Sequence, residues 1–248
     1  RNITMKKHLF SLLILFCGAS TIFAAETSES GVADPASYLD SIKRELQTQW
    51  SKNRTIHLVF HGHSVPAGYF KTPEVRSFHA YPLLTHQAVK EIYPFAVLNA
   101  INTSIGGEQS ESGAARFQRD VLTHRPDVLF IDYALNDRGI GLERAKKAWE
   151  TMIEAALAQN VKVILLTPTP DWSVDILDDK TPLAQHAQQI RELAAKYHVG
   201  LADSYAAFKE KVQNGENIRD YLSQINHPNE KGHRVVTALI MRYFTITE

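Results

Sequence analysis

The sequence predicts a single α/β domain built on a parallel sheet that helices cover on both faces. Five short apolar runs alternate with longer segments in which apolar residues recur every three or four positions. Continuous apolar runs are typical of strands buried on both faces, and strand–helix alternation is typical of parallel sheets. No linker or internal repeat interrupts the alternation. The expected strands span residues 55–60, 95–99, 127–133, 161–167 and 199–202.

The segments between these runs predict helices. The clearest spans residues 142–157, where the apolar side chains fall on one helical face. Another begins at Thr181-Pro182, a capping hydroxyl followed by the proline that suits a first helical turn, and its apolar positions continue to Ala194. Further helices are expected over residues 36–50, 78–91, 111–122, 204–212 and 229–243.

The first part of the chain predicts a secretory signal peptide. Lys6 and Lys7 precede an uncharged apolar stretch over residues 9–23, which ends in Ala24-Ala25. The stretch is shorter than the about 20 residues that a membrane-spanning helix needs, which argues against an anchor. We therefore expect a signal peptide over residues 1–24, with a four-residue extension before the first Met, and a mature domain over residues 25–248.

Charge and cysteine content exclude several classes of protein. The 27 basic residues are balanced by 27 acidic ones, so no basic excess is present to displace counterions from a nucleic acid. Cys17 is the only cysteine and lies inside the expected signal peptide. The mature domain is therefore expected to have no disulfide, no thiol nucleophile and no zinc–thiolate site. The bulky Phe16 before Cys17 argues against lipid attachment there.

Residues suited to acyl transfer follow the expected strands. In open α/β sheets, ligands bind beyond the carboxyl ends of the strands. Ser64 follows the first strand, Gly106-Gly107 follows the second and Asn136 follows the third. His227 precedes the last helix. A nucleophile, backbone donors at a glycine turn, an amide donor and a base are the parts that acyl transfer requires.

These residues belong to four blocks that lie in a characteristic order. The blocks are Leu58-Val-Phe-His-Gly-His-Ser64, Ser104-Ile-Gly-Gly-Glu-Gln-Ser110, Ala134-Leu-Asn-Asp137 and Gln224-Ile-Asn-His-Pro228. In order and spacing they are similar to the Gly-Asp-Ser, glycine, Gly-x-Asn-Asp and Asp-x-x-His-Pro blocks of the SGNH/GDSL hydrolase superfamily of esterases and lipases. The resemblance covers residues 54–245, nearly the whole mature chain.

The resemblance implies a fold, a mechanism and a set of site residues. The fold is a three-layer α/β/α sandwich of the flavodoxin-like kind, with a five-stranded parallel sheet. Ser64 is the implied nucleophile and His227 the implied base. The N–H groups of Ser64 and Gly107 and the side-chain amide of Asn136 are the implied oxyanion hole. No cofactor is implied.

Two positions depart from the family pattern. His63 stands where an aspartate normally precedes the serine, and Gln224 stands where an aspartate normally orients the catalytic histidine. The second change removes the carboxylate that would stabilise the imidazolium. We expect Gln224, through its amide oxygen, or a backbone carbonyl to orient His227, with Asp171 as a third candidate.

Other residues near these blocks admit two interpretations each. His61 and His63 have a spacing found in metal sites, but no third ligand accompanies them and alternate strand residues face opposite ways, so no metal is expected. Tyr69, Arg138 and Trp172 either line the substrate cleft, where an aromatic ring stacks on a sugar, or pack beneath the loops.

These observations predict an exported serine esterase, periplasmic or secreted, that hydrolyses short-acyl esters such as acetyl esters of carbohydrates. The absence of a lid-like apolar insertion favours a small acyl pocket. The expected partner is a small-molecule or glycan ester, with no nucleic acid and, once the signal peptide is cleaved, no membrane. Two alternatives stay open, a lipase or thioesterase acting on longer acyl chains and a non-catalytic glycan-binding relative. The oligomeric state is not predicted.

Overall fold

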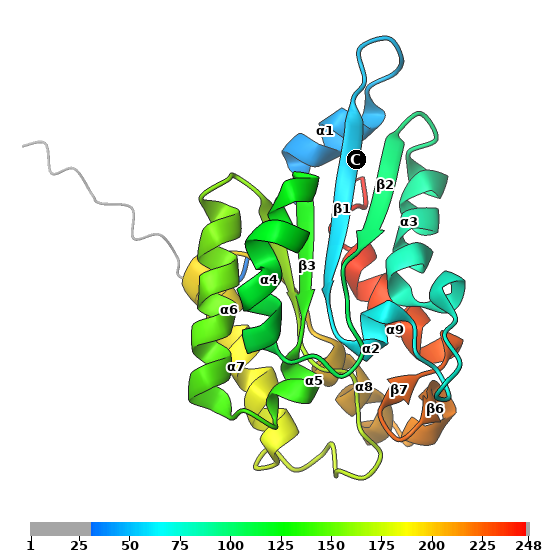
Figure 1. The fold of residues 1–248 in the computed structure, drawn as a ribbon. Coiled ribbons are helices and arrows are strands. Elements are labelled where there is room, and N and C mark those ends of the chain that lie inside the picture. The colour runs from blue at the N-terminus through cyan, green and yellow to red at the C-terminus, as the bar shows by residue number, and fades with distance from the viewer. Residues whose placement is uncertain (1–30, 247–248) are drawn as a thin grey trace, which may run out of the picture.

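A computed structural model describes residues 31–246, which fold around a five-stranded parallel sheet (Figure 1). The strand order is β2-β1-β3-β4-β5. The sheet and its flanking helices confirm the α/β prediction, because each expected apolar run contains or overlaps a strand. The strands are β1 Thr55–Gly62, β2 Val97–Asn102, β3 Val128–Asp132, β4 Lys162–Leu166 and β5 Gly200–Ala202.

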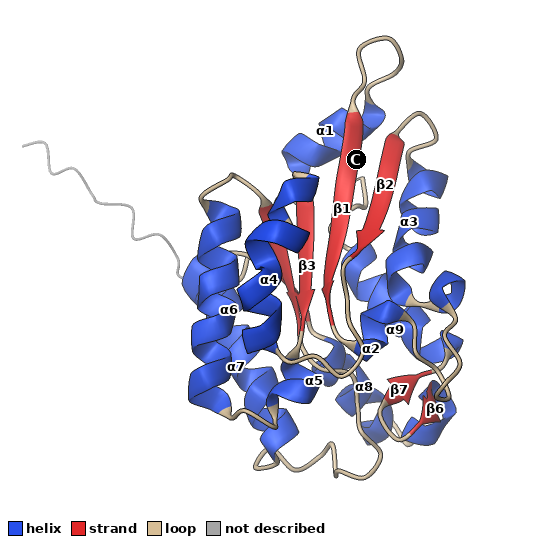
Figure 2. Ribbon diagram, viewed as in Figure 1, coloured by secondary structure: helices blue, strands red, loops and turns tan. Residues whose placement is uncertain are grey.

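Helices cover both faces of the sheet (Figure 2). On one face, α4, α6 and α7 bury apolar side chains against Val59, Leu129 and Val163. On the other face, α1, α3, α8 and α9 pack against the strand residues whose side chains point to that side of the sheet, among them Leu58 and Phe60. The long helices are α1 Asp40–Gln47, α3 Tyr81–Ile92, α4 Ser110–Asp120, α6 Leu142–Leu157, α7 Pro182–Tyr197, α8 Ser204–Gln213 and α9 Glu230–Met241.

The sequence pattern misses two short helices and one pair of short strands that lie at the carboxyl end of the sheet. They are α2 Ser64–Ala67, α5 Ala134–Asp137 and a two-stranded antiparallel pair of β6 Leu222–Gln224 with β7 His227–Pro228. Segments of two to four residues are too short to show a periodicity. β2 also begins two residues later than expected, since it lies at the sheet edge and its side chains are only partly buried.

The end of β1 is closely packed against β3. Gly62 lies opposite Asp132, and a Cβ atom at Gly62 would come within 2.4 Å of the Asp132 carbonyl oxygen and 2.7 Å of the Pro66 ring. Only glycine therefore allows the chain to turn from β1 directly into α2 at this point. This close approach fixes where the first residue of α2, Ser64, stands relative to the sheet.

The expected signal peptide over residues 1–24 lies outside the described residues. None of the helices within residues 31–246 combines the length and the apolar character that crossing a bilayer requires.

Candidate active site

The predicted site residues come together where the carboxyl ends of the strands meet. In Figure 1, α2, α5 and β7 gather at this end of the sheet. Ser64 begins α2 after β1, Asn136 lies in α5 after β3, and His227 begins β7. The loop that carries Gly107 follows β2. Four segments that are far apart in the sequence thus supply one site, as expected for a parallel α/β sheet.

Ser64 and His227 are hydrogen-bonded to each other. His227 Nε2 lies 2.9 Å from Ser64 Oγ, and both residues are buried. Ser64 begins a helix whose preceding residue, His63, accepts the N–H of Val65 through Nδ1 at 3.3 Å. A serine hydroxyl at hydrogen-bond distance from an imidazole nitrogen is the arrangement from which a base removes the hydroxyl proton.

The other ring nitrogen of His227 faces a backbone carbonyl. Nδ1 lies 3.0 Å from the carbonyl oxygen of Phe70. Because a carbonyl only accepts, this hydrogen bond requires the proton to be on Nδ1. Nε2 then keeps its lone pair and faces Ser64. The carbonyl of Phe70 therefore selects the tautomer that general-base catalysis needs.

Gln224 lies beside the same nitrogen but is held by Thr72. Gln224 Oε1 accepts the Thr72 N–H at 2.9 Å, and Nε2 lies 3.0 Å from Thr72 Oγ1 and 2.7 Å from His227 Nδ1. In this amide orientation Nε2 faces a protonated Nδ1 without being able to accept its proton. Rotating the amide would point Oε1 at Nδ1 but would lose the bond from the Thr72 N–H. With the proton on Nδ1, the contact with Gln224 Nε2 is not a hydrogen bond, because both groups are donors, and the main-chain oxygen of Phe70 is the acceptor beside Nδ1.

Asp171, the third candidate to orient His227, has other partners. Its carboxylate pairs with Arg138 at 3.0 Å and accepts both the N–H and the hydroxyl of Ser173. The described residues that contact the polar ring atoms of His227 are Ser64, Phe70 and Gln224. The structure therefore does not bring Asp171 to this histidine, and Arg138 is occupied by Asp171.

The electrostatic surroundings keep His227 neutral. Burial lowers the pKa of His227 below its usual value of 6.5, and the hydrogen bond to the Phe70 carbonyl offsets part of this shift. The nearby His63 lowers it further. An imidazole that is uncharged at neutral pH is ready to accept a proton.

Three groups are the candidate oxyanion donors: the N–H groups of Ser64 and Gly107 and the side-chain amide of Asn136. Gly107 has a φ of +78°, a left-handed conformation that favours glycine. Asn136 donates one amide hydrogen to the carbonyl of Glu108 at 2.8 Å, which leaves its second amide hydrogen available. Within the described part of the chain, neither the Gly107 N–H nor the Ser64 N–H has a hydrogen-bond acceptor.

The histidines at the end of β1 face different environments. His61 contacts Thr103 Oγ1, the Gly113 carbonyl and Tyr133, and burial lowers its pKa to about 4. His63 Nε2 is 3.3 Å from Asp132 Oδ1 without the alignment of a hydrogen bond. Over residues 31–246, no three potential metal-binding side chains of His, Cys, Asp or Glu come together.

The aromatic residues near the site differ in placement. The centroid of the Tyr69 ring lies 6.1 Å from that of the His227 imidazole. A Cβ atom at Gly106 would come within 3.0 Å of the Tyr69 ring. Tyr69 therefore stands between the base and the glycine loop. Trp172 is partly exposed, and its backbone N–H donates to the carbonyl oxygen of Ile225. The guanidinium of Arg219 lies over the Trp172 ring, 4.6 Å from its centroid.

Sequence reasoning did not find several residues of this site. The Phe70 carbonyl has no side-chain signature, since any residue would supply it. The contact between His63 and Asp132 depends on the register of β1 against β3, which the sequence alone does not show. Glu108 stands in the glycine block, and its pairing with Arg116 was not predicted; the opposite charges at positions 108 and 116 were the available signal.

Comparisons with known proteins identify the family and the fold of the chain. The model of the GDSL-like Lipase/Acylhydrolase family matches residues 60–235. A catalytic mutant of an acetylxylan esterase from Geobacillus stearothermophilus has the same fold, with a TM-score of 0.67 and 18% identity over 81% of this chain and 97% of that one. A two-domain esterase active on acetylated mannans aligns with a TM-score of 0.69 and 20% identity over 87% of this chain and 55% of its own.

A sequence relative is also known. The uncharacterized lipoprotein YqeF of Bacillus subtilis is 35% identical over 81 residues, which cover 29% of this chain and 33% of that protein. The family match extends over most of the chain and contains the strand ends, the glycine loop and the histidine described above. The chain therefore belongs to the GDSL-like lipase/acylhydrolase family.

Proposed function

We propose that this protein is an exported serine esterase that removes short acyl groups, acetyl groups above all, from esters of carbohydrates. The observation that carries the proposal is the 2.9 Å contact between Ser64 Oγ and His227 Nε2, with the Nδ1 proton directed at the Phe70 carbonyl. Together these contacts give a nucleophile next to a base of the correct tautomer.

The proposed reaction proceeds through an acyl-enzyme. Ser64 Oγ attacks the ester carbonyl while His227 Nε2 accepts the hydroxyl proton. The N–H groups of Ser64 and Gly107 and the amide of Asn136 stabilise the oxyanion, each donor contributing about 3 kcal/mol. His227 then gives its proton to the leaving alcohol. In the second half, His227 takes a proton from water, the hydroxide attacks the acyl carbon, and Ser64 is released with its proton restored.

Three observations support a small acyl group and a sugar alcohol. Tyr69 occupies the space between His227 and the glycine loop, which limits the room beside the reacting carbonyl. Trp172 is partly exposed, and its backbone N–H donates to the carbonyl of Ile225, two residues before His227. Arg219 lies over one face of its ring, and the opposite face is the one on which we propose that a sugar stacks. Two structural neighbours are esterases of acetylated xylan and acetylated mannans.

Export is the part of the proposal that rests on the sequence. Lys6, Lys7 and the apolar stretch over residues 9–23 support a signal peptide. The name of the relative from Bacillus subtilis, a lipoprotein, is in keeping with export.

A series of nitrophenyl esters from acetyl to decanoyl tests this function. We expect the mature wild-type protein to cleave the acetyl ester with the highest kcat/KM and the Ser64→Ala variant to cleave none. A decanoyl preference would instead make the protein a lipase or thioesterase. No turnover of any ester by folded wild-type protein would overturn the esterase and favour a glycan-binding relative, which saturable binding of xylo-oligosaccharides would then identify.

A further inference from the structure

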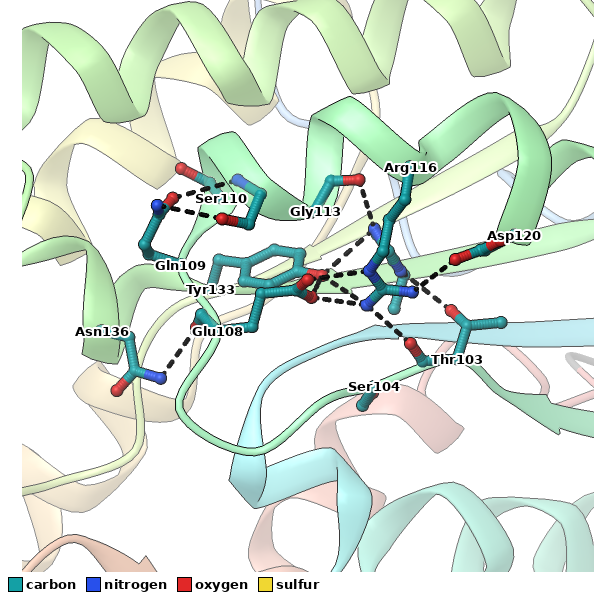
Figure 3. A network of polar contacts seen from close by, with 12 residues as sticks. Thr103, Ser104, Glu108, Gln109, Ser110, Gly113, Arg116, Asp120, Tyr133 and Asn136 are labelled. Atoms are coloured by element: carbon teal, nitrogen blue, oxygen red, sulfur yellow. Dashed lines mark hydrogen bonds and ion pairs between the residues drawn. The ribbon is translucent and has the colours of Figure 1, made fainter.

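The loop that carries Gly107 is fixed by a buried ion pair. Glu108, directly after Gly107, accepts two hydrogen bonds from Arg116 of α4, from Nε at 2.8 Å and from Nη2 at 2.5 Å. Tyr133, directly after β3, donates its hydroxyl to Glu108 at 2.7 Å. The side chains of Glu108 and Arg116 are only 8% and 11% exposed. Figure 3 shows the carboxylate between the guanidinium and the phenol.

Arg116 also holds the other end of this loop. Its Nη2 donates to the carbonyl oxygen of Thr103 at 2.7 Å, and its Nη1 lies 3.5 Å from Asp120. The guanidinium of Arg116 thus hydrogen-bonds both Thr103, the first residue after β2, and Glu108, the residue after Gly107. We call Glu108, Arg116 and Tyr133 the loop clamp. Planar, bidentate pairing of this kind restricts orientation as well as distance.

The main chain of Glu108 links the loop clamp to Asn136, another candidate oxyanion donor. The Glu108 carbonyl accepts the side-chain amide of Asn136 at 2.8 Å, as Figure 3 shows. The Glu108 nitrogen is joined by a peptide bond to the carbonyl carbon of Gly107. The position of Glu108 therefore bears on the Asn136 amide through this hydrogen bond and on the Gly107 N–H through the adjoining main chain. The two donors lie on different elements but share this one residue.

The charge state of the loop clamp fits a permanent ion pair. Burial alone would raise the pKa of Glu108, but the hydrogen bonds from Arg116 and Tyr133 outweigh burial and lower it. Glu108 is thus ionised at neutral pH. A buried ion pair of this kind adds little net stability compared with apolar residues of similar size. Its geometric precision is the property that an apolar pair would not supply.

We propose that Glu108, Arg116 and Tyr133 are positioning residues that fix the Gly107 N–H and the Asn136 amide at the spacing an oxyanion requires. The inference rests on the proposed function, because it assigns the loop clamp to the oxyanion hole of that reaction. The clamp does not contact the reacting atoms. It acts through the loop and through Asn136, so its loss weakens transition-state binding more than substrate binding.

The variants Glu108→Gln and Tyr133→Phe test this role at two independent points. Each removes a charge or one hydroxyl while keeping the shape of the side chain. We expect kcat for nitrophenyl acetate to fall roughly 10- to 100-fold in Glu108→Gln, somewhat less than for complete loss of an oxyanion donor, and several-fold in Tyr133→Phe. KM and the pH midpoint of kcat/KM are expected to stay unchanged, since His227 keeps its contacts.

A matched control is available in the same molecule. Arg191 forms a similar bidentate pair with Asp203, at 2.7 Å and 3.0 Å, on α7 and the residue before α8. Asp203→Asn removes a charge from that pair in the way that Glu108→Gln does from the loop clamp. We expect Asp203→Asn to leave kcat unchanged even where it lowers the melting temperature as much as Glu108→Gln does.

The possible results separate the two proposals. If folded Glu108→Gln and Tyr133→Phe both keep wild-type kcat while Ser64→Ala is inactive, the positioning role is wrong and the esterase mechanism stands. If kcat falls in Asp203→Asn as far as in Glu108→Gln, the effect is a general loss of stability and the positioning role is also wrong. A wild-type protein without esterase activity overturns the proposed function and the positioning role with it.

Discussion

Replacement of Ser64 by alanine is expected to lower kcat for acetyl esters by roughly 10⁶-fold, as is replacement of His227 by alanine. The two side chains meet through a single hydrogen bond of 2.9 Å, so either change leaves the other without a partner for proton transfer. Because they act as one unit, the double variant is expected to be no slower than either single variant. Steady-state hydrolysis of nitrophenyl acetate measures all three.

Folding of these variants is the control for this prediction. Circular dichroism and thermal unfolding are expected to change little in Ser64→Ala, since only one small buried hydroxyl is removed. Residual activity in Ser64→Ala close to that of the wild type would contradict the assignment of the nucleophile. Multiplication of the two single effects in the double variant would show that the residues act separately.

The variant Gln224→Glu is expected to raise kcat at alkaline pH by roughly tenfold or more, since it places a carboxylate at the atom now 2.7 Å from His227 Nδ1. A carboxylate accepts from Nδ1, from the Thr72 N–H and from the Thr72 hydroxyl at once, so the present contacts survive. Its negative charge stabilises the imidazolium that forms in the transition state, which the Phe70 carbonyl does only as a dipole.

The same variant is expected to change the pH dependence in a defined direction. Free His227 must be neutral to accept the Ser64 proton, so kcat/KM falls as the pH decreases through the pKa of His227. In the wild type burial lowers that pKa below 6.5, so activity persists into mildly acidic solution. A carboxylate at position 224 raises the pKa of His227, because a nearby negative charge favours the protonated ring, and the fall in kcat/KM then occurs at higher pH. The two profiles are expected to cross.

Asp171→Asn is the control for the Gln224→Glu variant. Asp171 is bound to Arg138 and Ser173, so its loss is expected to leave the pH midpoint unchanged. A loss of kcat in Asp171→Asn as large as that in Ser64→Ala would show that Asp171, rather than Phe70, supports His227. An unchanged profile in Gln224→Glu would contradict the placement of residue 224 beside Nδ1.

The fold was predictable from the sequence because burial leaves a strong pattern. β3 and β4 are buried on both faces and read as continuous apolar runs, and α6 and α7 show helical spacing over their full lengths. The edge strand β2 was displaced in the prediction because its pattern mixes buried and exposed residues. Elements such as α5 were missed because four residues carry no period.

The site was predictable only in part, and for a related reason. Ser64, Gly107, Asn136 and His227 could be proposed from the sequence because they lie in blocks of recognisable residue types. The acceptor for the His227 Nδ1 proton is a main-chain atom of Phe70, which any amino acid would provide. The tie between Glu108 and Tyr133 joins residues 25 positions apart and depends on the pairing of strands, which local sequence does not encode.

The most direct test of the central claim is detection of the acyl-enzyme by mass spectrometry. Mature protein is mixed with nitrophenyl acetate, quenched in acid within the first turnovers and digested. An added acetyl group on the peptide that contains Ser64, absent from Ser64→Ala treated in the same way, is the result that the account predicts. Turnover of the ester with the label on another residue, or undiminished turnover by Ser64→Ala, would contradict it.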